Sequence, residues 1–126
     1  MPVQRITSQE FGKLENPGVL SEQLVWKDNA PDAQATITRV TMQPGAEQSR
    51  HRHDSSEQIW LIISGTATIL LDNEETAEMF TGEIYKTPPG EVHGILNDGT
   101  EPLIYIAVTT PPQDFSAAYE VRNLKR

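Results

Sequence analysis

The clearest regularity along the chain is a series of short apolar stretches rich in β-branched residues, separated by clusters of small and polar residues. In residues 34–42, QATITRVTM, apolar and polar side chains alternate with the period of a half-buried strand. The pattern predicts strands over residues 34–42, 58–63, 66–71, 83–87, 92–96 and 102–109. Turn residues separate them at 43–45, 64–65, 72–75, 88–90 and 97–102.

No window of helical length shows an apolar period near 3.6 residues, so the pattern favours an all-β sandwich or barrel, and a jelly roll fits it. We expect a single domain over residues 1–126. It would comprise an N-terminal arm at 1–33, a core barrel at about 34–110 and a C-terminal tail at 111–126. The tail begins with two prolines and ends in basic residues, which predicts an extended arm or a short helix lying over the barrel.

Composition excludes several classes of partner and one class of metal ligand. The net charge of −8 and the scattered basic residues argue against nucleic acid as a partner. There is no cysteine, so any metal must be held by nitrogen and oxygen atoms. The N-terminus lacks an apolar leader and the longest purely apolar run, Ile59–Ile63, is too short to cross a bilayer. We therefore expect a cytoplasmic protein without a membrane partner.

The candidate chemistry lies in the three histidines of the chain. His51 and His53 are one residue apart, so on a strand both side chains would point to the same face. His93, from another predicted strand, would complete a set of three nitrogen ligands, and Glu57 or Gln58 could add an oxygen. Such a set suits Fe, Mn, Ni, Co or Zn as a divalent ion, and the sequence does not choose among them.

Two strings of spaced residues surround these histidines. The first is Gly45, His51, His53, Gln58 and Gly65, and the second is Gly82, Pro88, Gly90, His93 and Asn97. Over about residues 34–110 they resemble the paired motifs of the cupin superfamily, the second at every position and the first at every position but one. The resemblance, to small single-domain RmlC-like cupins, implies a double-stranded β-helix, or jelly-roll barrel, with one divalent metal per chain held inside its mouth.

The departure from the cupin motif concerns the oxygen ligand. Cupins of this type usually carry Glu where this chain has Gln58, and Glu57 takes that place only if the strand carries a bulge. The strand period puts Gln58 on the pocket side, which favours Gln58 with Glu57 as the alternative. A neutral amide leaves the metal charge uncompensated, which weakens metal affinity and strengthens the attraction for a carboxylate or enolate.

Other side chains of the predicted strands are candidates for the pocket wall, although strand residues of these types more often belong to the core. Arg39 either meets a substrate carboxylate or forms a cross-strand salt bridge on the surface. The candidates for the substrate pocket are Trp60, Ile62, Met42, Arg39, Tyr85 and Tyr105.

Two functions follow from the resemblance. The first is an enzyme that acts on a small oxygenated or carboxylate-bearing metabolite by metal-stabilised enolate chemistry, as a dioxygenase or as an isomerase or lyase. Its catalytic residues stay unidentified, with Glu57 and Tyr105 as candidates for a general base. The second is a non-catalytic module that binds or senses a small molecule. If Gln58 does not ligate and His93 only forms hydrogen bonds, the barrel would hold no metal.

Small cupins usually pair, so we expect a homodimer. The apolar side chains of the first thirty residues offer material for such a contact. They are Phe11, Leu14, Val19, Leu20 and Trp26.

Overall fold

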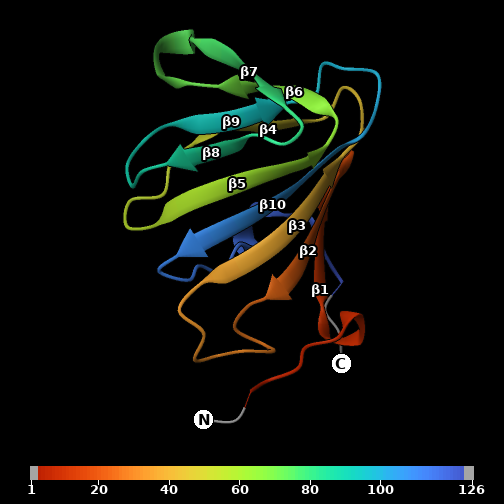
Figure 1. Cartoon of the computed structure of the whole chain (residues 1–126), viewed down its shortest axis with the longest axis vertical. Coiled ribbons are helices and arrows are strands. Elements are labelled where there is room, and N and C mark those ends of the chain that lie inside the picture. Colours follow the sequence, from red (N-terminus) through yellow and green to blue (C-terminus); the bar gives the residue numbers. More distant parts are fainter. Residues whose placement is uncertain (1–2, 124–126) are drawn as a thin grey trace.

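The computed structural model describes residues 3–123, and within this range the chain forms two antiparallel β-sheets that face each other (Figure 1). The seven-stranded sheet has the order β11-β1-β2-β3-β10-β5-β8, and the four-stranded sheet has the order β4-β9-β6-β7. The strands are β1 (Gly12–Asn16), β2 (Val19–Val25), β3 (Thr36–Met42), β4 (Glu47–His51), β5 (Glu57–Ser64), β6 (Thr66–Leu70), β7 (Thr76–Phe80), β8 (Ile84–Thr87), β9 (His93–Leu96), β10 (Leu103–Thr110) and β11 (Val121–Asn123). Three 3-10 turns join them: η1 (Ser8–Glu10), η2 (Asp72–Glu74) and η3 (Ser116–Ala118).

The architecture confirms the predicted all-β double-stranded β-helix. Each of the six predicted strands is present, as β3, β5, β6, β8, β9 and β10. Between residues 3 and 123, no helix has the length or the apolar character that crossing a membrane requires.

Five further strands were not expected from the hydrophobic pattern. In the segment expected to be an arm, β1 and β2 instead extend the larger sheet, and β11 of the tail pairs with β1. The other two, β4 and β7, are mostly exposed, and Met79 is the one buried residue of β7. Strands of this kind present few apolar side chains to a core, so alternation in the sequence does not reveal them.

The core fills the space between the two sheets. On β3, β5 and β10 alternate residues are buried, as the strand period requires. The larger sheet contributes Val40, Met42, Trp60, Ile62, Leu103, Tyr105 and Ala107, and the smaller sheet contributes Ala67, Ile69, Met79 and Ile95.

The inner face of the larger sheet changes character along its strands. At one end, Met42 lies opposite Leu103, and both side chains are fully buried. At the other end a row of buried polar side chains crosses four neighbouring strands: Thr36, Thr109, Gln58 and Thr87. The barrel is therefore apolar at its closed end and polar at its mouth.

Two positions explain why the motifs contain Gly and Asn. Gly65 has a φ of +89°, and a Cβ there would lie 2.5 Å from the carbonyl oxygen of Pro102, so only glycine fits this turn. The fully buried Asn97 donates to the carbonyl oxygens of Met42 and Glu101 and accepts from the amide of Gly99. Asn97 therefore satisfies backbone groups at the turn that follows β9.

Candidate metal centre

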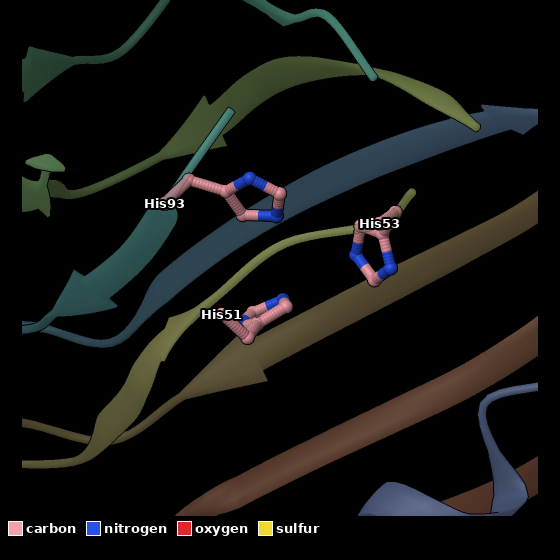
Figure 2. A group of neighbouring side chains, drawn as sticks. All are labelled: His51, His53 and His93. Atoms are coloured by element: carbon pink, nitrogen blue, oxygen red, sulfur yellow. The ribbon is translucent and has the colours of Figure 1, made fainter. Parts of the chain in front are cut away.

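The three histidines meet at the mouth of the barrel (Figure 2). His51 is the last residue of β4, His53 lies in the loop that follows, and His93 is the first residue of β9. Their ring centroids are 4.9 Å apart for His51 and His53, 4.5 Å for His51 and His93, and 5.1 Å for His53 and His93. One ring nitrogen of each lies within 4.8 Å of the corresponding nitrogens of the other two, so the group could hold a metal ion.

A β-bulge in β4 brings two of these histidines together. Gln48 pairs with Ile95 and His51 pairs with His93, so two residues of β4 lie opposite the single residue Gly94. A Cβ on Gly94 would lie 2.7 Å from the carbonyl oxygen of Gln48, so this close approach of the strands requires glycine. The bulge sets His51 directly across from His93.

Backbone carbonyl groups orient two of the rings. His51 Nδ1 lies 2.7 Å from the carbonyl oxygen of Ser49, and His93 Nδ1 lies 3.1 Å from that of Glu91. A carbonyl oxygen only accepts, so in the neutral imidazoles the proton is on Nδ1 and the lone pair is on Nε2. Such second contacts orient imidazoles that bind metals.

The site keeps its buried imidazoles neutral. Burial, and then the neighbouring His51, lower the pKa of His93 from 6.5 to about 4. The same two causes, in the same order, lower the pKa of His53. Among the residues that the structure describes, the Nε2 atoms of both histidines are buried and have no hydrogen-bond partner. Two buried ring nitrogens without partners are what a metal ion would satisfy once each presents its lone pair.

The histidines line a cavity of about 500 Å³ at the mouth. One wall is the polar end of the larger sheet, with Thr38 and Gln58, and another is the tail from Gln113 to Tyr119. The expectation that the tail lies over the barrel is correct, since its η3 turn contributes Ala117 and Ala118 to this wall.

The two candidates for the oxygen ligand lie on opposite faces of β5. Gln58 is buried and lines the cavity, where its amide donates to Thr109 Oγ1 at 3.0 Å and accepts from Trp60 Nε1 at 3.3 Å. Glu57 is on the outer face and pairs with Lys86 at 3.2 Å. The pairing of β5 with β10 and β8 is regular at these residues, so no bulge turns Glu57 inward.

Four of the six candidates for the pocket wall are on the inner side of the larger sheet, but only two of them line the cavity. Trp60 and Tyr105 line the cavity, and burial raises the pKa of the Tyr105 phenol far above its ordinary value. Met42 and Ile62 are buried in the core instead.

The other two candidates lie elsewhere. Arg39 forms a bidentate ion pair with Glu22 on the outer face of the larger sheet, which is the cross-strand salt bridge of the two alternatives. Tyr85 packs at the edge of the core, and its hydroxyl contacts Glu83. Neither residue lines the cavity. Arg39 points to the outer face of β3, and Tyr85 is on β8, the edge strand of the larger sheet.

Sequence reasoning missed several residues of the cavity wall. Gln48 donates to the Tyr105 hydroxyl at 2.8 Å, and Gln113 contacts His53 Nδ1 at 3.1 Å. The ring of Phe115 packs against the edge of His53 at 5.7 Å, and Tyr119 lines the same wall. Gln48 is on a strand without an apolar pattern and the other three are in the tail, so no local motif marks them.

The chain belongs to the cupin family, because a family described as "Cupin domain" matches residues 38–109, more than half of the chain. This match confirms the resemblance given by the two motifs. It includes all three histidines.

Related proteins extend the similarity beyond the matched segment. The chain is 26% identical over 116 residues to an uncharacterized protein of Methanocaldococcus jannaschii, with 89% of this chain and 92% of that one covered. It is 28% identical over 105 residues to an oxalate-binding protein of Thermotoga maritima, with 83% and 84% covered. The structure of an ectoine synthase from P. lautus superposes with a TM-score of 0.73 at 15% identity over 94% of this chain and 83% of that one, which shows a shared fold.

The lowered pKa of His93 predicts how pH affects the stability of the metal-free protein. Unfolded His93 takes up a proton near pH 6.5, whereas folded His93 does so near pH 4. The unfolded chain therefore binds more protons between these values, and the free energy of unfolding falls as pH falls from about 6.5 to about 4. The whole loss is on the order of 3 kcal/mol.

Urea unfolding of the metal-free protein at pH 7 and pH 5 measures this effect. Other groups also titrate in this range, so the comparison is with His93→Gln, which keeps a polar side chain without a titrating ring. The variant should lose less stability between the two pH values than the parent does. Equal losses in the two proteins would contradict the lowered pKa.

Proposed function

We propose that this cupin binds one divalent metal through His51, His53 and His93 and thereby holds a small carboxylate-bearing metabolite in the cavity. The observation that carries the proposal is the pair of buried Nε2 atoms without partners, on His53 and His93, close to the third histidine. A buried polar atom that has lost water and gained no partner is costly. A metal ion would remove that cost at both nitrogens.

The donor set fits Fe, Mn, Ni, Co or Zn, since imidazole suits these ions. Metal–nitrogen distances are about 2.1 Å, so two ligand atoms of one metal are at most about 4.2 Å apart. The three ring nitrogens therefore have to draw together from their present separation of up to 4.8 Å. A metal bound there would supply Lewis-acid stabilisation of negative charge on a carboxylate or an enolate.

Gln58 is the proposed oxygen ligand. Its Oε1 already accepts from Trp60, and an amide oxygen has a second lone pair that a metal can take. Since three imidazoles and an amide are all neutral, the bound metal would keep its full charge. The site would then favour an anionic ligand over a neutral one.

The cavity wall suits an oxygenated anion. Because the pKa of the Tyr105 phenol is raised, it stays protonated at neutral pH and can donate a hydrogen bond, but it is a poor general base. Thr38 and Gln58 add neutral polar groups to the wall. Glu57 points away from the cavity toward Lys86, which leaves it unsuited to move a proton there.

The proposed activity is enzymatic: the chain would stabilise an enolate form of its substrate, as a dioxygenase or as an isomerase or lyase. A second candidate is a non-catalytic module, favoured by the similarity to the oxalate-binding protein of Thermotoga maritima, which spans most of both chains. Turnover of a small carboxylate by the metal-loaded protein favours the enzyme. Tight binding without turnover favours the module.

Metal content is the direct test of the proposed site. Protein purified without chelators should contain about one divalent transition-metal ion per chain by elemental analysis, or should take one up on titration. The double variant His51→Ala/His53→Ala should contain none, because a single histidine is left. If the parent contains no metal and takes none up, the proposed function is wrong.

The oxygen ligand can be tested by exchanging its chemistry. Gln58→Glu places a carboxylate at the cavity wall and should tighten metal binding at least tenfold, because the added charge compensates that of the metal. The matched control is Glu57→Gln, the reverse exchange one residue away on the outer face. Its metal affinity should stay within about twofold of the parent by calorimetric titration. A large loss in the control would instead assign the role to Glu57.

We also infer a homodimer, through a contact that includes Leu20 of the five side chains predicted for it and otherwise lies on the larger sheet. Leu14, Val19 and Trp26 are buried within their own chain and cannot serve it. The outer face of the larger sheet instead carries partly exposed apolar side chains between its ion pairs. They are Leu20, Ile37, Ile59, Leu61, Ile104, Ile106 and Val108.

Light scattering at micromolar concentration should give about twice the chain mass of 14.0 kDa. Leu61→Glu, on the outer face, should give a monomer, because it places a charge in the apolar contact. Phe80→Glu is the control, since Phe80 is 46% exposed on the smaller sheet. A monomeric parent would contradict the dimer.

A further inference from the structure

The three histidines differ in what holds the second ring nitrogen. Backbone carbonyl groups two residues earlier hold His51 and His93, through Ser49 and Glu91. The Nδ1 atom of His53 lies 3.1 Å from Nε2 of the Gln113 side-chain amide, and Gln113 is 60 residues away in the tail. The orientation of one ring of the triad therefore depends on a distant segment.

The chemistry of the amide decides which nitrogen of His53 is available. With the Gln113 NH₂ group toward the ring, Nδ1 accepts, the ring proton is on Nε2, and Nε2 cannot bind a metal. With the amide turned by half a rotation, its oxygen accepts a proton from Nδ1, and the lone pair of Nε2 points into the cavity. His51 and His93 have no such alternative, because a carbonyl oxygen cannot donate.

We propose that Gln113 is a positioning residue of the metal centre. With its amide turned by half a rotation from the orientation in this structure, its oxygen accepts the Nδ1 proton of His53 and presents His53 Nε2 as the third ligand. The proposal rests on the proposed metal site. It adds to that site a residue that lies outside both motifs and outside the matched cupin segment.

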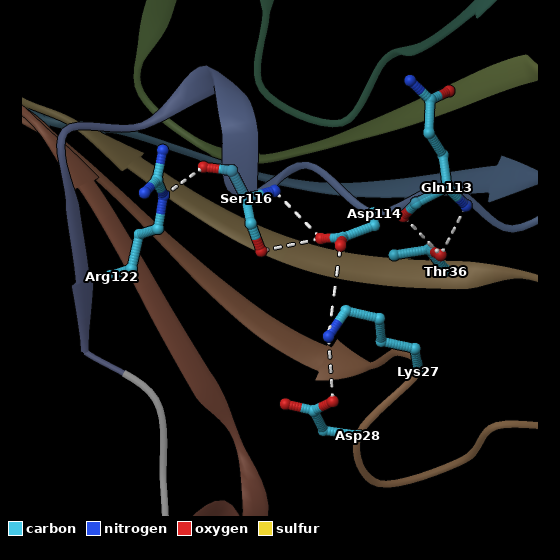
Figure 3. A network of polar contacts seen from close by, with 7 residues as sticks. All are labelled: Lys27, Asp28, Thr36, Gln113, Asp114, Ser116 and Arg122. Carbon is cyan, nitrogen blue, oxygen red and sulfur yellow. Dashed lines mark hydrogen bonds and ion pairs between the residues drawn. The ribbon is translucent and has the colours of Figure 1, made fainter.

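The structure holds Gln113 firmly enough for this role. Its backbone amide donates to Thr36 Oγ1 at 2.9 Å, and the Thr36 hydroxyl donates to its carbonyl oxygen at 3.0 Å. Thr36 is 2% exposed and sits in the polar row of the larger sheet. The backbone of Gln113 is therefore tied to β3, and its side chain extends away from Thr36 (Figure 3). Phe115 packs on His53 at 72° between the ring planes.

The rest of the tail is fixed by its own polar contacts (Figure 3). Asp114 accepts from the backbone amide and the hydroxyl of Ser116, at 3.0 and 2.7 Å, and lies 4.0 Å from Lys27 Nζ. Arg122 Nε donates to the carbonyl oxygen of Ser116 at 2.7 Å. These contacts seat the segment that follows Gln113 without touching a histidine.

Two variants of Gln113 distinguish the hydrogen bonding of its amide from the space that its side chain fills. Gln113→Met keeps the length of the side chain and removes the hydrogen bond, so Zn(II) should bind 10- to 100-fold more weakly, as is typical when such a partner of a ligand is lost. Gln113→Glu offers only acceptor atoms when ionised and should bind Zn(II) at least as tightly as the parent. The control is Gln48→Met, the same change at a cavity amide that contacts Tyr105, and its affinity should stay within about twofold.

Calorimetric titration with Zn(II) measures these affinities, and urea unfolding of each metal-free variant shows that it is folded. Nitrogen-15 NMR of the histidine rings supplies a readout that a merely structural role would not move. In the Zn(II)-loaded parent, His53 should have a proton on Nδ1 and a metal-bound Nε2. In Gln113→Met this signature should be lost or mixed, while those of His51 and His93 persist.

The outcomes distinguish this inference from the proposed function. If the parent binds no Zn(II), both are wrong. If the parent binds Zn(II) and Gln113→Met binds it equally tightly, only the role of Gln113 is wrong. A proton on Nε2 of His53 in the loaded parent, or weaker binding by Gln113→Glu than by Gln113→Met, would also overturn it.

Discussion

The structure depends on the change from apolar to polar side chains along the inner face of the larger sheet. Where Met42 and Leu103 meet, the two sheets pack closely and exclude water. Where Thr36, Thr109 and Gln58 lie in a row, the buried groups need hydrogen bonds. Gln58 and Thr109 satisfy each other, and Thr36 binds the backbone of the tail. A barrel closed by apolar packing at one end thus keeps an open polar mouth at the other.

The three histidines line the cavity at that mouth. Burial favours the neutral form of His93 and His53, and neutral imidazoles are the form that binds metals. The same burial leaves two Nε2 atoms without partners in the described part of the chain. Backbone carbonyl groups contact Nδ1 of His51 and His93, and the side-chain amide of Gln113 contacts Nδ1 of His53. The site is therefore organised by two strands and by a tail that a motif search would pass over.

Fold and chemistry are separate questions for a cupin barrel. The similarity to an ectoine synthase at 15% identity shows that one architecture serves proteins of different names, so the fold does not choose the reaction. What bears on the reaction is the wall of this cavity: a neutral amide in place of the usual carboxylate, a protonated phenol, and hydroxyl groups. None of these groups is a strong base at neutral pH.

The sequence by itself determined the features that depend on local spacing. Alternating side chains predicted six strands and the inward face of Gln58, and glycines predicted turns at Gly45, Gly65 and Gly90, where φ is positive. The two motifs identified the family and predicted that His51, His53 and His93 form one metal site. These predictions succeeded because strand period and turn geometry act over a few neighbouring residues.

Only the tertiary structure decided what depends on contacts between distant segments. The bulge that sets His51 opposite His93 depends on the approach of β4 to β9, and the contact from Gln113 to His53 depends on where the tail lies. Arg39 pairs with Glu22 because β2, in the segment expected to be an arm, joined the sheet beside β3. Polar side chains carry no periodic signal, and no local rule says which of them will meet once the barrel closes.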